Sequence, residues 1–115
     1  GTLSATVQSG SKYTLSLSAA EPDLSPSKGG SDKIVASNGL TAANSWGIKM
    51  KTGAADDANA EAYTAITPTS TVFYTSAAAA ETEAITNFEI GVKTTKTLPA
   101  DTYSTTVTVT AATTN

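Results

Sequence analysis

Apolar and polar residues alternate along several stretches of the chain. The alternation runs through residues 3–7 and again through residues 13–19, with Ser9-Gly10-Ser11 between them. A β-strand that buries one face and wets the other has this period of two, because successive side chains point to opposite faces. The pattern therefore predicts two early strands separated by a turn or bend at residues 9–11.

The clearest strand signals lie in the middle and near the end of the sequence. Residues 46–51 alternate sharply, and residues 88–93 and 103–111 repeat the pattern. Leu98-Pro99-Ala100-Asp101 separates the last two stretches, so they are expected to form a hairpin-like pair joined by a corner. The inward positions of these three strands form the predicted core: Trp46, Ile48, Met50, Phe88, Ile90, Val92, Tyr103, Val107 and Val109.

Shorter elements are expected between these strands. Residues 21–32 contain two prolines and Gly29-Gly30, which predicts a loop. Ile34 and Ala36 are the inward pair of a short strand that Asn38-Gly39 ends. The remaining expected segments are a polar connection at 52–62, short strands at 63–66 and 71–75 interrupted by Pro68, and a loop with one turn at 76–84.

Together these signals predict an all-β fold. About seven to eight short strands at this chain length imply two packed antiparallel sheets, and 115 residues suit a single domain that spans residues 1–115. The composition agrees with this interpretation, because the chain is rich in Thr, Ser and Ala and poor in long helix-forming residues.

The composition also limits the chemistry. The sequence has no Cys, His or Arg, so it cannot build a disulfide, a Ser-His-Asp triad, a Cys-His dyad or a His-ligated zinc site. Two acidic pairs, Glu81 with Glu83 and Asp56 with Asp57, lie in small polar segments with few aromatic residues to shape a sugar cleft. They are interpreted as solubilising charge. The sequence therefore predicts a protein that is not an enzyme and needs no cofactor.

The charge balance excludes some classes of partner. A formal net charge of -3 argues against nucleic acid and anionic membranes, since both are bound through clustered Lys and Arg. No stretch approaches the roughly 20 apolar residues that cross a bilayer, so direct membrane insertion is not expected. The segment after Gly1 is neither basic nor apolar, unlike a signal peptide, and the chain is interpreted as a mature fragment or an excised module.

A weak calcium site is one candidate for binding chemistry. Asp56, Asp57, Asn59 and Glu61 offer oxygen ligands in a polar connection, which is the ligand type that calcium prefers. The set lacks the central Gly and the register of an EF-hand loop. The main expectation is therefore that no metal is bound.

Aromatic residues provide a second candidate. Trp46 could either stack on a sugar ring or pack in the core. Core packing is favoured, because Ile48 and Met50 share its face of the strand. Gly47 beside it lets a neighbouring strand or side chain approach closely. Tyr63 and Tyr74, together with the loop acids, are the residues of an alternative carbohydrate-binding role.

The strand residues fall into a pattern that resembles immunoglobulin-like domains of bacterial cell-surface proteins. In that family a Tyr-x-Leu-x-Leu strand precedes a Trp-Gly strand, and an apolar-Gly-Val strand leads into Leu-Pro-Ala-Gly-x-Tyr-x-x-x-Val-x-Val. The matching residues, which span nearly the whole chain, are Tyr13, Leu15, Leu17, Trp46-Gly47, Ile90-Gly91-Val92, Leu98-Pro99-Ala100, Tyr103, Val107 and Val109. Asp101 stands where the family has a turn Gly, and Asp tolerates the left-handed region better than most residues. Tyr103 is expected to hydrogen-bond back to the turn, as in a tyrosine corner.

The resemblance implies an extracellular module, located at the cell surface or cell wall, with a structural or adhesive role and no catalytic residues. Its expected partners are neighbouring modules or subunits of the same surface protein or fibre, with a glycan or a host or cell-surface protein as further candidates. One alternative is a polymerising pilin or fibre subunit that exchanges a strand between neighbours, with residues 3–7 as the donor. A self-complete sandwich is instead expected to be monomeric.

Overall fold

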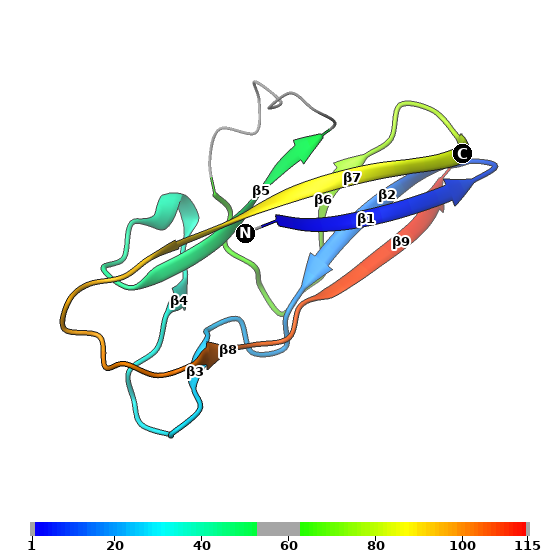
Figure 1. Ribbon diagram of the computed structural model, residues 1–115. Helices are drawn as coiled ribbons and strands as arrows, with labels where there is room; N and C mark the ends of the chain where they lie inside the picture. The colour runs from blue at the N-terminus through cyan, green and yellow to red at the C-terminus, as the bar shows by residue number, and fades with distance from the viewer. Residues whose placement is uncertain (1, 53–62, 115) are drawn as a thin grey trace.

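The chain folds into strands with short connections (Figure 1). The computed structural model describes residues 2–52 and 63–114, apart from the side chains of Thr2 and of residues 50–52. The described elements are β1 (Thr2–Ser9), β2 (Lys12–Ser18), β3 (Ser25–Pro26), β4 (Val35–Ala36), the 3₁₀ turn η1 (Asn38–Leu40), β5 (Ser45–Thr52), β6 (Thr71–Thr75), β7 (Ala80–Lys93), β8 (Tyr103–Ser104) and β9 (Thr108–Thr114). The all-β prediction is confirmed.

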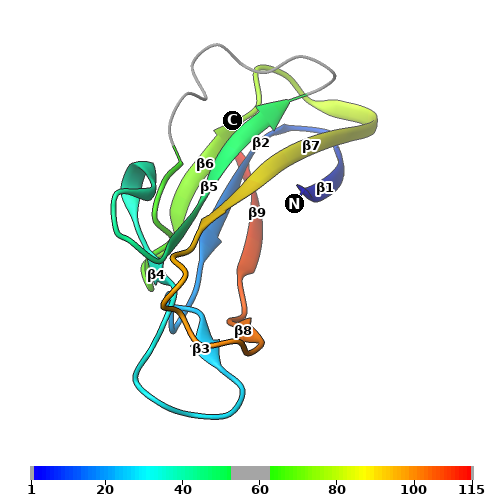
Figure 2. The same ribbon diagram turned by 60° about the vertical axis from the view of Figure 1, so that its left-hand side comes forward.

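Two sheets face each other as a sandwich. The first has the strand order β1-β7-β5-β4 and the second the order β6-β2-β9, while β3 and β8 form a small separate pair. Figures 1 and 2 show that β1 and β9 border the same side of the sandwich, away from β4. Strands β4 and β5 run parallel, whereas β5 and β7 run antiparallel, so the first sheet is mixed. The prediction that both sheets are antiparallel throughout was therefore wrong.

The core lies between the two layers. Residues 13–17 of β2 bury every second side chain, as their alternation predicts. Trp46, Ile48 and Phe88 supply the facing layer from β5 and β7, with exposed fractions of 3%, 0% and 0%. The ring of Phe73 in β6 meets Phe88 edge-on, with centroids 6.4 Å apart, so the two sheets are in direct aromatic contact.

The other predicted core positions have mixed outcomes. Ile90, Tyr103 and Val107 are partly buried and pack against the core, whereas the side chain of Met50 lies outside the described part. Val92 and Val109 are 53% and 39% exposed, so the prediction that they are core residues was wrong. Val92 lies one residue from the end of β7, and Val109 lies on an edge strand, so neither is covered on all sides.

The segment predicted as a loop at 76–84 is partly a strand. Ala80 begins β7, and residues 80–84 pair with the second half of β1 through Ser9↔Ala80 and Val7↔Ala84. The alanine run gives little local preference for a strand, so the pairing partner decides its conformation. The strand predicted at 63–66 is instead a single bridge between Thr64 and Ile48, although Ile66 is buried.

The predicted closing hairpin does not form. Strand β7 pairs with β1 and β5 in the first sheet, whereas β9 pairs with β2 in the second. The predicted strand at 103–111 is also divided, because β8 pairs with β3 before β9 begins. Alternation identifies a strand and its buried face but not its neighbour, and both edges of β7 are already occupied.

The corner between these strands is tied by side chains. The Tyr103 hydroxyl donates to the Pro99 carbonyl at 2.7 Å, which confirms the expected hydrogen bond back to the turn. Asp101 does not adopt a positive φ; among the described non-glycine residues this conformation occurs at Leu40. Instead, the Asp101 carboxylate accepts bonds from the Ser27 hydroxyl at 2.5 Å and the Lys28 amide at 3.0 Å, which hold its pKa below the ordinary value. The corner is thereby fastened to the 21–32 loop.

Replacing Trp46 with Ala should strongly destabilise the fold. The indole is buried, and its Nε1 donates to the Pro22 carbonyl at 2.9 Å, so truncation removes packing and leaves an acceptor without its partner. We expect Trp46→Ala to lower the free energy of unfolding by about 3–5 kcal/mol in urea denaturation. Val92→Ala is the matched control: Val92 lies directly opposite Trp46 across the β5–β7 pair but is exposed, so a loss within about 0.5 kcal/mol is expected. Equal losses for the two variants would contradict the assignment of Trp46 to the core.

Candidate functional site

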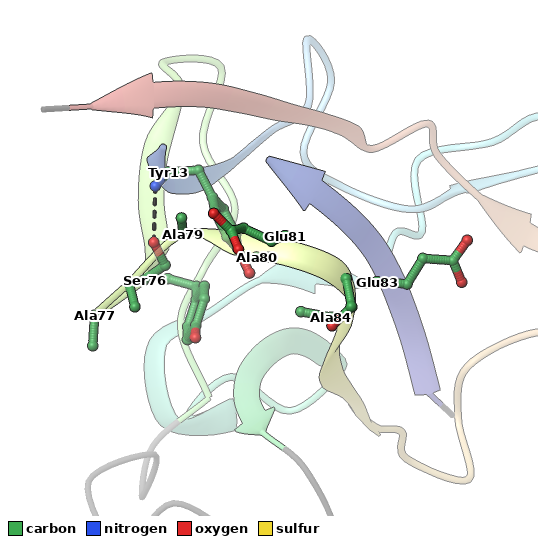
Figure 3. Close-up of a pocket in the computed structure, with 11 residues that line it drawn as sticks. Tyr13, Ser76, Ala77, Ala79, Ala80, Glu81, Glu83 and Ala84 are labelled. Carbon is green, nitrogen blue, oxygen red and sulfur yellow. Dashed lines mark hydrogen bonds between the residues drawn. The ribbon is translucent and has the colours of Figure 1, made fainter. Parts of the chain in front are cut away.

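A hollow of about 720 Å³ opens beside the start of β7. Tyr13 and Tyr74 form one wall, and residues 76–84 line the rest (Figure 3). Strand β2 supplies the first tyrosine and β6 the second, and the connection that follows β6 arches over the end of the sandwich. We therefore consider this hollow as a candidate ligand site.

A reciprocal pair of hydrogen bonds fixes the wall of the hollow. The Tyr13 amide donates to the Ser76 hydroxyl at 2.8 Å, and the Ser76 amide donates to the Tyr13 carbonyl at 2.9 Å. Ser76 is buried, and the rings of Tyr13 and Tyr74 lie with centroids 6.0 Å apart at an angle of 49°. The connection after β6 is therefore attached to the start of β2 and cannot move away without breaking both bonds.

The chemistry that the hollow presents is limited. Tyr13 is only 3% exposed, so its ring face is not available for stacking on a ligand. Burial, with a contribution from neighbouring Tyr13, raises the pKa of Tyr74, so this phenol stays neutral at physiological pH. Glu81 and Glu83 are exposed, and Figure 3 shows the Glu83 side chain extending away from Tyr13. Alanine methyl groups make up much of the remaining lining, and they give little to recognise a specific ligand.

The two tyrosines proposed for sugar binding do not form one site. Tyr74 lines the hollow in the second sheet, whereas Tyr63 lies against the outer face of the first sheet, over β5 and β7. The Lys49 ammonium lies 5.3 Å from the centre of the Tyr63 ring, within the range of a cation–π contact. The geometry therefore does not favour the carbohydrate site built from Tyr63 and Tyr74.

A pair of glycines seats Tyr63. Gly47 and Gly91 are directly opposite each other in the β5–β7 pair. A Cβ added at Gly91 would lie 2.5 Å from two carbons of the Tyr63 ring, and one at Gly47 would lie 3.0 Å from the Tyr63 Cβ. The expectation that Gly47 permits a close approach is confirmed. Only the bare backbone of both strands leaves room for this ring.

The sequence suggested two further candidate sites, at Trp46 and in the acidic connection. Trp46 is too buried to stack on a sugar, so its interpretation as a packing residue holds. The calcium candidates Asp56, Asp57, Asn59 and Glu61 lie outside the described residues. Within residues 2–52 and 63–114, no three acidic side chains gather where a metal ion could be held. The same residues contain no helix long and apolar enough to cross a membrane.

Polar side chains in the connections are directed at the main chain of distant segments. Asn38 Oδ1 accepts from the Ala65 amide at 2.8 Å, Asn44 Oδ1 from the Thr95 amide at 2.7 Å, and Asp23 Oδ1 from the Ala36 amide at 3.1 Å. Sequence reasoning missed these residues. Asn and Asp in loops commonly bond to backbone groups, but the sequence carries no signal of which distant segment each one reaches.

Comparisons with protein-family models, curated proteins and solved structures found no match for the chain.

Adding a methyl group at Gly91 should displace Tyr63. We expect Gly91→Ala to destabilise the fold by about 1–3 kcal/mol, the range for inserting a methyl group into a packed site. Tyr63→Ala removes the obstacle, so the double variant should lose less than the two single variants together. Gly10→Ala is the control, because no atom lies within 4 Å of its added Cβ. The readout is urea denaturation of all four variants, and strictly additive losses would show that the ring does not rest on Gly91.

Proposed function

We propose that the chain is an extracellular structural or adhesive module of a bacterial cell-surface protein, with an immunoglobulin-like arrangement of its sandwich. The observation that carries the proposal is that polar side chains in the connections bond to the main chain of distant segments and so hold the fold together. The expected partners are neighbouring modules or subunits of the same surface protein.

The polar side chains of the connections point toward backbone groups of the chain itself, which favours a structural role over binding a small ligand. In a binding or catalytic site, several polar side chains converge on one concave space. Here Asp23, Asn38, Asn44 and Asp101 are distributed over the connections, and each accepts a hydrogen bond from a backbone amide elsewhere in the chain. Such groups stabilise a scaffold, since each one satisfies a donor that a loop would otherwise leave unpaired.

The pairing of β1 supports a self-contained module over a strand-exchanging fibre subunit. Strand β1 pairs antiparallel with β7 from Thr2↔Glu89 to Ser9↔Ala80, within one chain. Its inward residues Leu3, Ala5 and Val7 pack against the core. The place beside β7 that a donated strand would take is therefore filled by the chain's own first strand.

Antibody labelling tests the proposed location. An antibody raised against the folded chain should stain intact cells of the organism that encodes it, because a displayed module is accessible from outside. Staining should disappear after the cells are treated with external protease. An antibody against a cytoplasmic protein serves as the control for cell integrity. Staining that requires permeabilisation would contradict an extracellular role.

Removal of β1 separates a module from a fibre subunit. We expect the full chain to form no filaments in light scattering, and a chain lacking residues 1–10 to remain unassembled but to unfold at lower denaturant, because it loses the β1–β7 pairing. Both chains should unfold in a single cooperative transition. Filaments from the full chain that the deletion abolishes would instead establish strand exchange through β1.

A further inference from the structure

One long edge of the sandwich has a regular and unbroken strand. Strand β9 lies at the end of the second sheet, and it pairs with β2 continuously from Lys12↔Thr114 to Ser18↔Thr108. The register of β1 shifts near Val7 and that of the β2–β6 pair shifts after Leu15, whereas β9 has no shift. Such irregularities are one way in which proteins keep sheet edges from pairing with other chains, and β9 lacks it.

The same edge leaves apolar surface uncovered. Val109 is 39% exposed, and Ala111, the next residue on the same face of β9, is also exposed. Strand β1 borders this side of the sandwich from the opposite sheet (Figures 1 and 2). Its inward residues Leu3 and Val7 are only partly buried. The inner faces of both edge strands therefore remain partly open to solvent along one side of the molecule.

This side also carries no charge on its strands. The chain has 7 basic and 10 acidic residues, yet residues 2–9 and 108–114 contain none of them and no proline. Charged side chains and proline are the common means of blocking an edge strand, so β9 is chemically free to pair. A two-fold contact places each surface patch against its own copy, which disfavours charged patches and suits an uncharged one.

We infer that the side of the sandwich bordered by β1 and β9 binds a second copy of this chain. In this arrangement the β9 strands of two copies pair antiparallel across a two-fold axis, and their three-stranded sheets become one continuous sheet. Val109 and Ala111 of each copy are then covered by the partner. The contact needs no exchange of strands, and it does not depend on the proposed function.

The size of the edge sets the strength of this contact. Seven paired residues span about 24 Å, and the gap between packed sheets is about 10 Å, so the strip that two copies share is small. The surface that this strip buries falls well below the roughly 1,200 Å² of total buried surface in a stable interface. We therefore expect a weak association, with a dissociation constant of about 10 μM to 1 mM. Where copies are held close together, their effective concentration is high, and a weak contact becomes occupied.

Charge substitutions on opposite edges of one sheet test the inference. Val109 on β9 and Val72 on β6 are both exposed valines, and β6 is the other edge strand of the same sheet. In sedimentation velocity from about 10 μM to 1 mM, the wild-type chain and Val72→Lys should both shift from monomer toward dimer with rising concentration. Val109→Lys should remain monomeric, with its dissociation constant raised at least about tenfold, because a charged side chain on an edge strand opposes its pairing with another chain.

Three outcomes would overturn the inference. They are a wild-type chain that stays monomeric at the highest concentration, a Val109→Lys chain that dimerises as wild type does, and a loss of dimerisation in Val72→Lys alone. Circular dichroism checks that each variant is folded. If Val109→Lys does not fold, Ala112→Lys decides in its place, because Ala112 is an exposed β9 residue on the face away from the core.

Discussion

The burial of Phe88 is the interaction on which the rest of the sandwich depends. Its strand β7 is paired on both sides over residues 86–89, with β1 along one edge and β5 along the other. Phe88 itself lies opposite Leu3 on one side and Met50 on the other, is fully buried, and meets Phe73 of the facing sheet. Three strands of one layer are therefore paired side by side at this position, and the Phe88 ring links them to one strand of the other layer. Loss of that ring would leave a void at the junction of the layers, because a packed core relaxes only partly around a missing side chain.

A chain rich in Thr, Ser and Ala has few other large side chains to bury, so its connections must be held by other means. The polar bonds from Asp23, Asn38, Asn44 and Asp101 to distant amides serve this purpose. The Tyr63 ring over Gly47 and Gly91 adds apolar contact to the outer face of the first sheet, where alternation alone predicts only wet residues. Order in the connections thus comes from specific contacts, because the core alone covers only the centre of the molecule.

The sequence predicted what depends on local pattern and failed on what depends on distant partners. Alternation in residues 13–17 and 46–48 correctly identified strands and their buried faces, because the period of two is a property of each strand alone. It could not show that β7 and β9 belong to different sheets, since register and neighbour are settled by the whole fold. The same limit applies to the candidate site. Tyr63 and Tyr74 were named together as residues of an alternative carbohydrate-binding role, but the contact of Tyr74 with Tyr13 and the position of Tyr63 on the other sheet depend on distant segments.

The edges of the two sheets are protected unequally. Strand β4 has two residues, too few to pair with another chain, and the edges formed by β1 and β6 each contain a shift in register. Strand β9 has neither device, although its Thr and Val residues favour extended structure and pairing. The residues that let the last strand fold so regularly on β2 are therefore the same ones that leave its other edge open. A sandwich of this composition gains an orderly closing strand and an accessible edge together, because both follow from a run without charge, proline or bulge.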